Sequence, residues 1–184
     1  MITKTIFAGS GGQGVLMMGY LLAVSAMKAG MQVTYLPSYG AEVRGGTANC
    51  TVAISDEEIA SPVASSPDYT VVLNQPSMMK FQDQMKKGGV MLINSSLVNG
   101  DPTRKDIEAV KLPASKLAAD LGNERTLNMI VVGAFVAKTR IISAESLTEG
   151  LKEVFKGKKQ GIIDLNQKGL NVGADYILKT ENKI

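Results

Sequence analysis

Residues 6–16, IFAGSGGQGVL, contain four glycines within six consecutive positions. Gly9, Gly11 and Gly14 have the spacing G-x-G-x-x-G. This spacing allows a tight turn, close approach of a ligand to the main chain, and tight packing of the following helix. The stretch therefore indicates a loop that exposes backbone to a phosphate, a cofactor or a partner.

The segments on either side of the glycines indicate a strand before them and a helix after them. Residues 3–8 are β-rich and alternate weakly, whereas residues 15–27 are apolar on every side, as in a helix buried against a sheet. Gly30 suits the position that ends this helix, and residues 32–36 form a second short strand that Pro37 stops. The chain is thus expected to open with a βαβ unit.

The remainder continues the alternation of strands and helices. Short apolar runs predict strands at residues 48–54, 69–73, 90–93 and 107–112. Helices are predicted at residues 76–87, 114–121, 126–138, 144–155 and, in part, 161–179. A turn at Ser55-Asp56 and a return at residues 58–60 predict a small antiparallel hairpin. We expect an α/β fold: one Rossmann-like three-layer domain over residues 1–184, with a mostly parallel sheet and this hairpin.

The composition excludes several function classes. The chain has 184 residues, of which 45% are hydrophobic and 20% charged, so it is long enough for one soluble domain with its own core. It contains no histidine, which excludes Ser-His-Asp and Cys-His catalysis and histidine-ligated zinc. Its single cysteine, Cys50, cannot supply the four thiolates that an iron–sulfur cluster usually needs. Cys50 has no basic neighbour in its strand, so we expect an inert thiol.

The net charge and the lengths of the apolar runs indicate the cell compartment and the classes of partner. The net charge is only +3 and the lysines are dispersed, so binding to nucleic acid is not indicated. The longest apolar runs, residues 15–27 and 129–137, are shorter than the roughly 20 residues that span a bilayer. The amino terminus lacks a signal-peptide pattern. We therefore expect a cytoplasmic protein without a membrane partner.

Polar residues near the ends of the predicted strands are candidates for a site. Asn74 and Asn94 each follow a strand, so in a parallel sheet they would lie at the same edge as the glycine loop. Gln13 and Ser10, within the loop, are as well suited to capping as to ligand contact. A purely structural role, as caps and turns, is the alternative for all four.

A dinucleotide is one candidate ligand for the glycine loop. The usual nicotinamide- or flavin-binding unit places Asp or Glu at the end of the second strand, to bind the ribose. Residues 33–37, VTYLP, contain neither, and Glu42 comes too late. A different phosphate-bearing ligand or a protein contact is therefore favoured over a dinucleotide.

A second loop, residues 39–47 (YGAEVRGGT), places Glu42 and Arg44 beside Gly45 and Gly46. Together, GSGGQG and SYGAEVRGGTANCTVAISDEEIASP resemble the gamma subunit of 2-oxoacid:ferredoxin oxidoreductases, over nearly the whole chain. The second loop is most similar to that of the 2-oxoglutarate type, although Ala41 stands where many relatives carry proline.

The resemblance implies one component of a larger enzyme. That enzyme decarboxylates a 2-oxoacid on thiamine diphosphate with Mg, passes electrons through iron–sulfur clusters to ferredoxin, and transfers the acyl group to coenzyme A. This chain has neither a cysteine set nor a thiamine-binding motif, so these cofactors are expected on alpha, beta and possibly delta subunits. The chain is expected to bind no cofactor alone and to be inactive alone.

The two loops are expected to form an interface with those subunits and to help bind coenzyme A. Arg44 would pair with a phosphate or with a carboxylate of a neighbouring chain, and Arg44→Ala should lower coenzyme A-dependent turnover. No catalytic or metal-binding residue is assigned. The candidate binding residues come from both loops: Gly9, Ser10, Gly11, Gly12, Gln13, Gly14, Tyr39, Glu42, Arg44, Gly45, Gly46 and Thr47.

Two other functions remain open at this point: a free-standing nucleotide-dependent reductase, and a regulatory ligand-binding module. A reductase would bind NAD(P) or flavin when purified alone, and a regulator would bind a small molecule without a partner. Most of the ten methionines are expected in the core, and Met78, Phe81 and Met85 form a helical stripe that faces the sheet.

Overall fold

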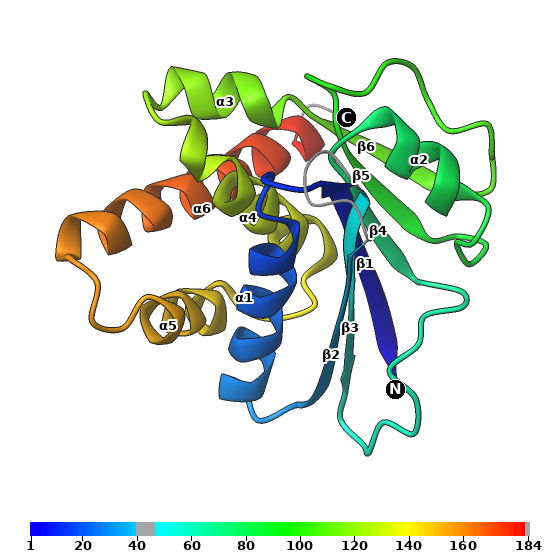
Figure 1. Ribbon diagram of the computed structural model, residues 1–184, viewed down its shortest axis with the longest axis horizontal. Helices are drawn as coiled ribbons and strands as arrows, with labels where there is room; N and C mark the ends of the chain where they lie inside the picture. The colour runs from blue at the N-terminus through cyan, green and yellow to red at the C-terminus, as the bar shows by residue number, and fades with distance from the viewer. Residues whose placement is uncertain (40–46, 183–184) are drawn as a thin grey trace.

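The computed structural model of the chain describes residues 1–39 and 47–182 (Figure 1). Six strands form one mixed sheet in the order β2-β3-β1-β4-β5-β6. Their bounds are β1 (Thr3–Ser10), β2 (Gln32–Tyr39), β3 (Thr47–Ser55), β4 (Tyr69–Val72), β5 (Val90–Asn94) and β6 (Glu108–Leu112). Strands β1, β4, β5 and β6 run parallel, and β3 is antiparallel to both β1 and β2. The predicted α/β class with a mostly parallel sheet is confirmed.

Helices cover both faces of the sheet. They are α1 (Val15–Lys28), α2 (Gln75–Gln82), α3 (Ala114–Asp120), the short 3₁₀ helix η1 (Glu124–Thr126), α4 (Leu127–Thr139), α5 (Ala144–Val154) and α6 (Gln160–Glu181). Figure 1 shows α2 on one side of the sheet and the other α-helices on the opposite side. On that larger side, the ring of Phe135 in α4 meets Phe7 of β1 and Tyr69 of β4 edge-on, with centroids 5.5 and 5.7 Å apart. The side chains of Met78, Phe81 and Met85 are buried as predicted, but only Met78 and Phe81 lie on α2, because Met85 follows the end of that helix.

The antiparallel part of the sheet differs from the prediction. Residues 58–60 form no strand, so the hairpin expected between residues 48–54 and 58–60 is wrong. Instead β3 pairs with β2 and is inserted between β2 and β1, which splits the expected βαβ unit. Strand β2 also continues past Pro37, which lies opposite Cys50. Because β2 is an edge strand, one side of its backbone needs no ladder partner, and a residue without an N–H group is tolerated there.

Two helices differ from their predicted lengths because of tertiary contacts. Helix α2 ends at Gln82 rather than at residue 87. The guanidinium of Arg104 donates to the carbonyl oxygens of Gln82 and Met85, at 3.2 and 2.6 Å, and these bonds satisfy carbonyl groups at the end of the helix. Helix α6 is unbroken for 22 residues despite Gly169 and Gly173. A Cβ at Gly173 would lie 1.9 Å from the carbonyl oxygen of Ile130, so this glycine permits close packing on α4.

Candidate functional site

The glycine loop connects β1 to α1 at the carboxyl end of β1. Gly12 and Gly14 have φ angles of +92° and +74°, which glycine adopts at little cost. Gly9 is required for space: a Cβ there would lie 2.6 Å from Oε1 of Gln13. The loop therefore needs glycine for both its turn and its close internal packing.

The polar side chains of the loop bond to its own backbone and to Asn74, the N-cap residue of α2. The backbone N–H of Ser10 donates to Oε1 of Gln13 at 2.7 Å. Nδ2 of Asn74 donates to the Ser10 hydroxyl at 2.7 Å, and Oδ1 of Asn74 caps α2 by accepting from the N–H of Ser77 at 2.9 Å. Asn94 links the next strand to α3, because its Nδ2 donates to the Ser115 hydroxyl at 3.2 Å. Asn74 and Asn94 thus lie at the loop's edge of the sheet, as predicted, and their observed contacts are structural.

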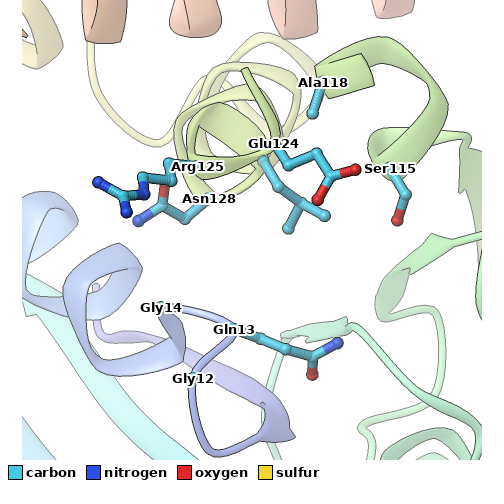
Figure 2. A pocket seen from close by; sticks show the side chains of 9 residues that line it. Gly12, Gln13, Gly14, Ser115, Ala118, Glu124, Arg125 and Asn128 are labelled. Atoms are coloured by element: carbon cyan, nitrogen blue, oxygen red, sulfur yellow. The ribbon is translucent and has the colours of Figure 1, made fainter. Parts of the chain in front are cut away.

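A cavity of about 410 Å³ lies between the glycine loop and the segment that begins α4. Figure 2 shows Gly12, Gln13 and Gly14 on one side, and Glu124, Arg125 and Asn128 on the other. Ser115, Ala118 and Leu127 complete the lining. The cavity brings together parts of the chain that are more than 100 residues apart in the sequence.

The charge around this cavity favours an anion. Helices α1 and α4 both begin there. The N-cap residue of α1, Gly14, makes no side-chain capping bond. Helix α4 continues from η1, so the N–H of Leu127 already donates to the carbonyl oxygen of Glu124, and that of Met129 to Oδ1 of Asn128 at 3.0 Å. Backbone N–H groups at helix starts, with the helix dipole, attract negative charge. Arg125 is exposed at the cavity and adds a guanidinium, which can bind a phosphate or carboxylate through two parallel hydrogen bonds, while Glu124 adds one opposing charge.

The second predicted loop is only partly within the described residues. Glu42, Arg44, Gly45 and Gly46 lie outside them. The residues that flank these positions are described: Tyr39 ends β2 opposite Ala48, and Thr47 begins β3 opposite Ser10 of the glycine loop. Both loops therefore start from the same edge of the sheet.

The side of the cavity formed by residues 115–128 is absent from the sequence-based site. One signal for it exists in the sequence, because Asn123 and Thr126 precede an apolar helical run and mark a helix start. A helix that leads away from the carboxyl edge of a parallel sheet places its start there. That Arg125 faces the glycine loop, however, depends on how α4 packs beside α1.

Among the residues that the structure describes, the Cys, Asp and Glu side chains form no group of three or more placed to hold a metal ion. The Cys50 thiol is fully buried, and desolvation raises its pKa to about 12, which confirms the predicted inert thiol. No helix in residues 1–39 and 47–182 has the length and apolarity that crossing a bilayer requires.

Comparison with known proteins now identifies the family. Residues 4–176 match the family model described as pyruvate ferredoxin/flavodoxin oxidoreductase. The chain belongs to this family. The expected resemblance to gamma subunits of 2-oxoacid:ferredoxin oxidoreductases is confirmed, because members similar to this chain include subunits named for such enzymes.

Two members of this oxidoreductase family show how the chain relates to proteins of different length. Ketoisovalerate oxidoreductase subunit VorA of Methanothermobacter thermautotrophicus is 39% identical over 170 residues, which are 92% of this chain and 35% of VorA. The 2-oxoglutarate synthase subunit KorC of Methanocaldococcus jannaschii is 33% identical over 172 residues, covering 91% of this chain and 92% of KorC. The chain thus spans about a third of VorA and nearly all of KorC.

A solved structure agrees with the fold. The gamma subunit of a keto/oxoacid ferredoxin oxidoreductase from Geobacter sulfurreducens is 29% identical and superimposes with a TM-score of 0.82. The match covers 96% of this chain and 99% of that subunit. The mixed sheet of this chain is therefore the fold of a gamma subunit in the oxidoreductase family.

Proposed function

We propose that this chain is the gamma component of a cytoplasmic 2-oxoacid:ferredoxin oxidoreductase that works with alpha, beta and possibly delta subunits. The observation that carries the proposal is the end-to-end match to KorC, which covers more than nine tenths of both chains. A chain with one buried cysteine and no histidine lacks the ligands for an iron–sulfur cluster, so the redox cofactors belong to partner subunits.

We further propose that the cavity beside the glycine loop helps bind coenzyme A. Coenzyme A carries phosphate groups. The uncapped start of α1 supplies N–H groups, and Arg125 supplies positive charge. Arg44 remains a proposed second contact, because its loop starts from Tyr39 and Thr47 at the same edge. Coenzyme A, when bound there, would accept the acyl group that the thiamine-bearing subunit forms.

The proposed 2-oxoacid is 2-oxoglutarate. KorC, with its full-length match, is named for that substrate, and the second loop resembles the same type. Ketoisovalerate, from VorA, and pyruvate, from the family description, are the competing substrates. All three share a 2-oxo group beside a carboxylate, so they differ only in the side chain that the substrate pocket must accept.

The experiment is to purify the chain with an affinity tag from the cells that produce it, and to analyse the copurified chains and cofactors. We expect thiamine diphosphate and iron–sulfur clusters in the complex, and ferredoxin reduction that depends on coenzyme A and is fastest with 2-oxoglutarate. The chain expressed alone serves as the control and should oxidise none of the three acids. A solitary chain that holds NAD(P) or flavin and oxidises a substrate would contradict the proposal.

A further inference from the structure

Helix α1 has an outward face that is unusually apolar for a surface helix. Met17, Tyr20, Val24 and Met27 follow one another at helical spacing along this face, which we call the α1 stripe. Met17, Tyr20 and Met27 are 36%, 48% and 63% exposed, and Val24 is half-buried. A helix that remains in water on one face normally carries polar residues there. The α1 stripe instead has the composition of a covered surface.

The surroundings of the α1 stripe also suit a protein partner. The Tyr20 ring meets the Tyr35 ring edge-on with centroids 6.1 Å apart. Beside Val24 and Met27 lies a hollow of about 360 Å³, bordered by the Lys28–Glu153 ion pair with an N–O distance of 3.0 Å. Tyr and Met are enriched, and unpaired charges depleted, at the centres of protein interfaces. The only charged residue of α1 is Lys28, which this pair already neutralises.

Helix α2 shows that exposed methionine alone does not make such a surface. Met79 is 49% exposed, but it is followed directly by the exposed Lys80, and the exposed Asp83 and Gln84 follow the helix. This face of α2 therefore carries the polar residues expected of a helix in water. Met79 provides a matched comparison for Met17 and Met27.

The position of the α1 stripe indicates which partner covers it. Met17 lies one turn after Gly14, so the stripe continues from the edge of the 410 Å³ cavity along the outside of the molecule. In VorA the matching segment is 35% of a longer polypeptide, so the corresponding domain is covalently joined there to a much larger part of the same chain. A partner that delivers an acyl group to the cavity must approach this edge, and the α1 stripe is the apolar surface that adjoins it.

We propose that the α1 stripe packs against the larger oxidoreductase component, of the kind that VorA carries in the same polypeptide, through an uncharged apolar surface. A side chain of that component fills the hollow beside Val24 and Met27. This inference rests on the proposed function, because it identifies the partner from the enzyme complex. It adds the face of the molecule through which the domain assembles.

Methionine oxidation tests the surface in the complex itself. Dilute hydrogen peroxide is applied to the purified, catalytically active complex and to the isolated chain, and sulfoxide at each methionine is measured by mass spectrometry. We expect Met17 and Met27 to oxidise at least tenfold more slowly in the complex, and Met79 to react equally in both. Unchanged oxidation rates at Met17 and Met27 in an active complex would overturn the proposal, whatever Met79 shows.

Matched substitutions test whether the contact holds the complex together. Met27→Lys and Met79→Lys are introduced singly, and the thermal unfolding of each isolated chain is compared with wild type to verify that it folds. We expect Met27→Lys to weaken assembly at least tenfold and Met79→Lys to leave it unchanged. If Met27→Lys assembles normally, or converts a dimer of the isolated chain into a monomer while the complex stays intact, the proposal is wrong.

These outcomes are separable from failure of the proposed function. If the tagged chain copurifies with no thiamine- or cluster-bearing subunit and no 2-oxoacid is oxidised, the proposed function fails first, and the partner proposal fails with it. If the complex is active but Met17 and Met27 of the α1 stripe are oxidised as fast as in the isolated chain, only the partner proposal fails.

Discussion

Gly14 and Asn128 are in direct contact across the start of α1 and the start of α4: a Cβ at Gly14 would lie 2.7 Å from Nδ2 of Asn128. This contact joins the glycine loop to the other wall of the cavity. The third glycine of the G-x-G-x-x-G pattern therefore serves helix packing here, in addition to its φ of +74°.

Gly14→Ala should be more destabilising than Gly12→Ala. Both residues have positive φ, so each substitution costs about 1–2 kcal/mol of backbone strain. Only Gly14 has a neighbour in the way, since nothing lies within 4 Å of a Cβ at Gly12. Urea unfolding should show a larger loss of unfolding free energy for Gly14→Ala than for Gly12→Ala. Equal losses for the two variants would mean that α4 yields freely and that the contact does not shape the cavity.

Gly173→Ala should separate α4 from α6. Its new methyl group would meet the carbonyl oxygen of Ile130, which belongs to a rigid helix backbone, and overpacking of this kind costs about 1–3 kcal/mol or more. Gly161→Ala, in the same helix but with open space around it, should instead stabilise the protein by about 0.5–1 kcal/mol. Guanidinium unfolding of both variants measures these two changes in the free energy of unfolding. A Gly173→Ala protein as stable as wild type would contradict the close packing.

The buried Cys50 thiol makes the free energy of unfolding depend on pH in the alkaline range. Burial raises its pKa from 9.0 to about 12, so between these values the unfolded chain loses a proton that the folded chain keeps. Stability from this group is complete below pH 9 and is lost as the pH rises towards 12. The difference in unfolding free energy between wild type and Cys50→Ala should shrink over this window. A constant difference would show that the thiol ionises equally in both states.

The sequence predicted most strands and helices because their apolar periods are strong and their ends are marked. One such mark is Ser143, which caps α5 by accepting from the N–H of Ser146 at 3.1 Å. The predicted hairpin is wrong because residues 58–60 offered a nearby return, whereas β3 pairs with two strands that precede it in the chain, β1 and β2. Local patterns do not decide between two candidate partner strands, since the pairing depends on burial of the whole sheet.

The candidate site was predicted on one side only. The glycine loop carries its signal in consecutive residues, so its place after β1 could be read directly. Arg125 and Asn128 carry no comparable motif, and they reach the cavity only because α4 packs beside α1. Gly169 and Gly173 are unfavourable residues within a helix, and close packing against α4 and the residue before it explains their presence in α6.

The proposed coenzyme A site is tested most directly by the Michaelis constants of the assembled oxidoreductase with Arg125→Ala. An Arg–phosphate bond contributes about 1.5–3 kcal/mol, so we expect the KM for coenzyme A to rise about tenfold or more while the KM for the 2-oxoacid is unchanged. The KM for coenzyme A of Arg125→Lys should lie between those of wild type and Arg125→Ala. Lys152 is an exposed cation on α5, and Lys152→Ala should have the wild-type KM. An Arg125→Ala complex with the wild-type KM for coenzyme A would contradict the account.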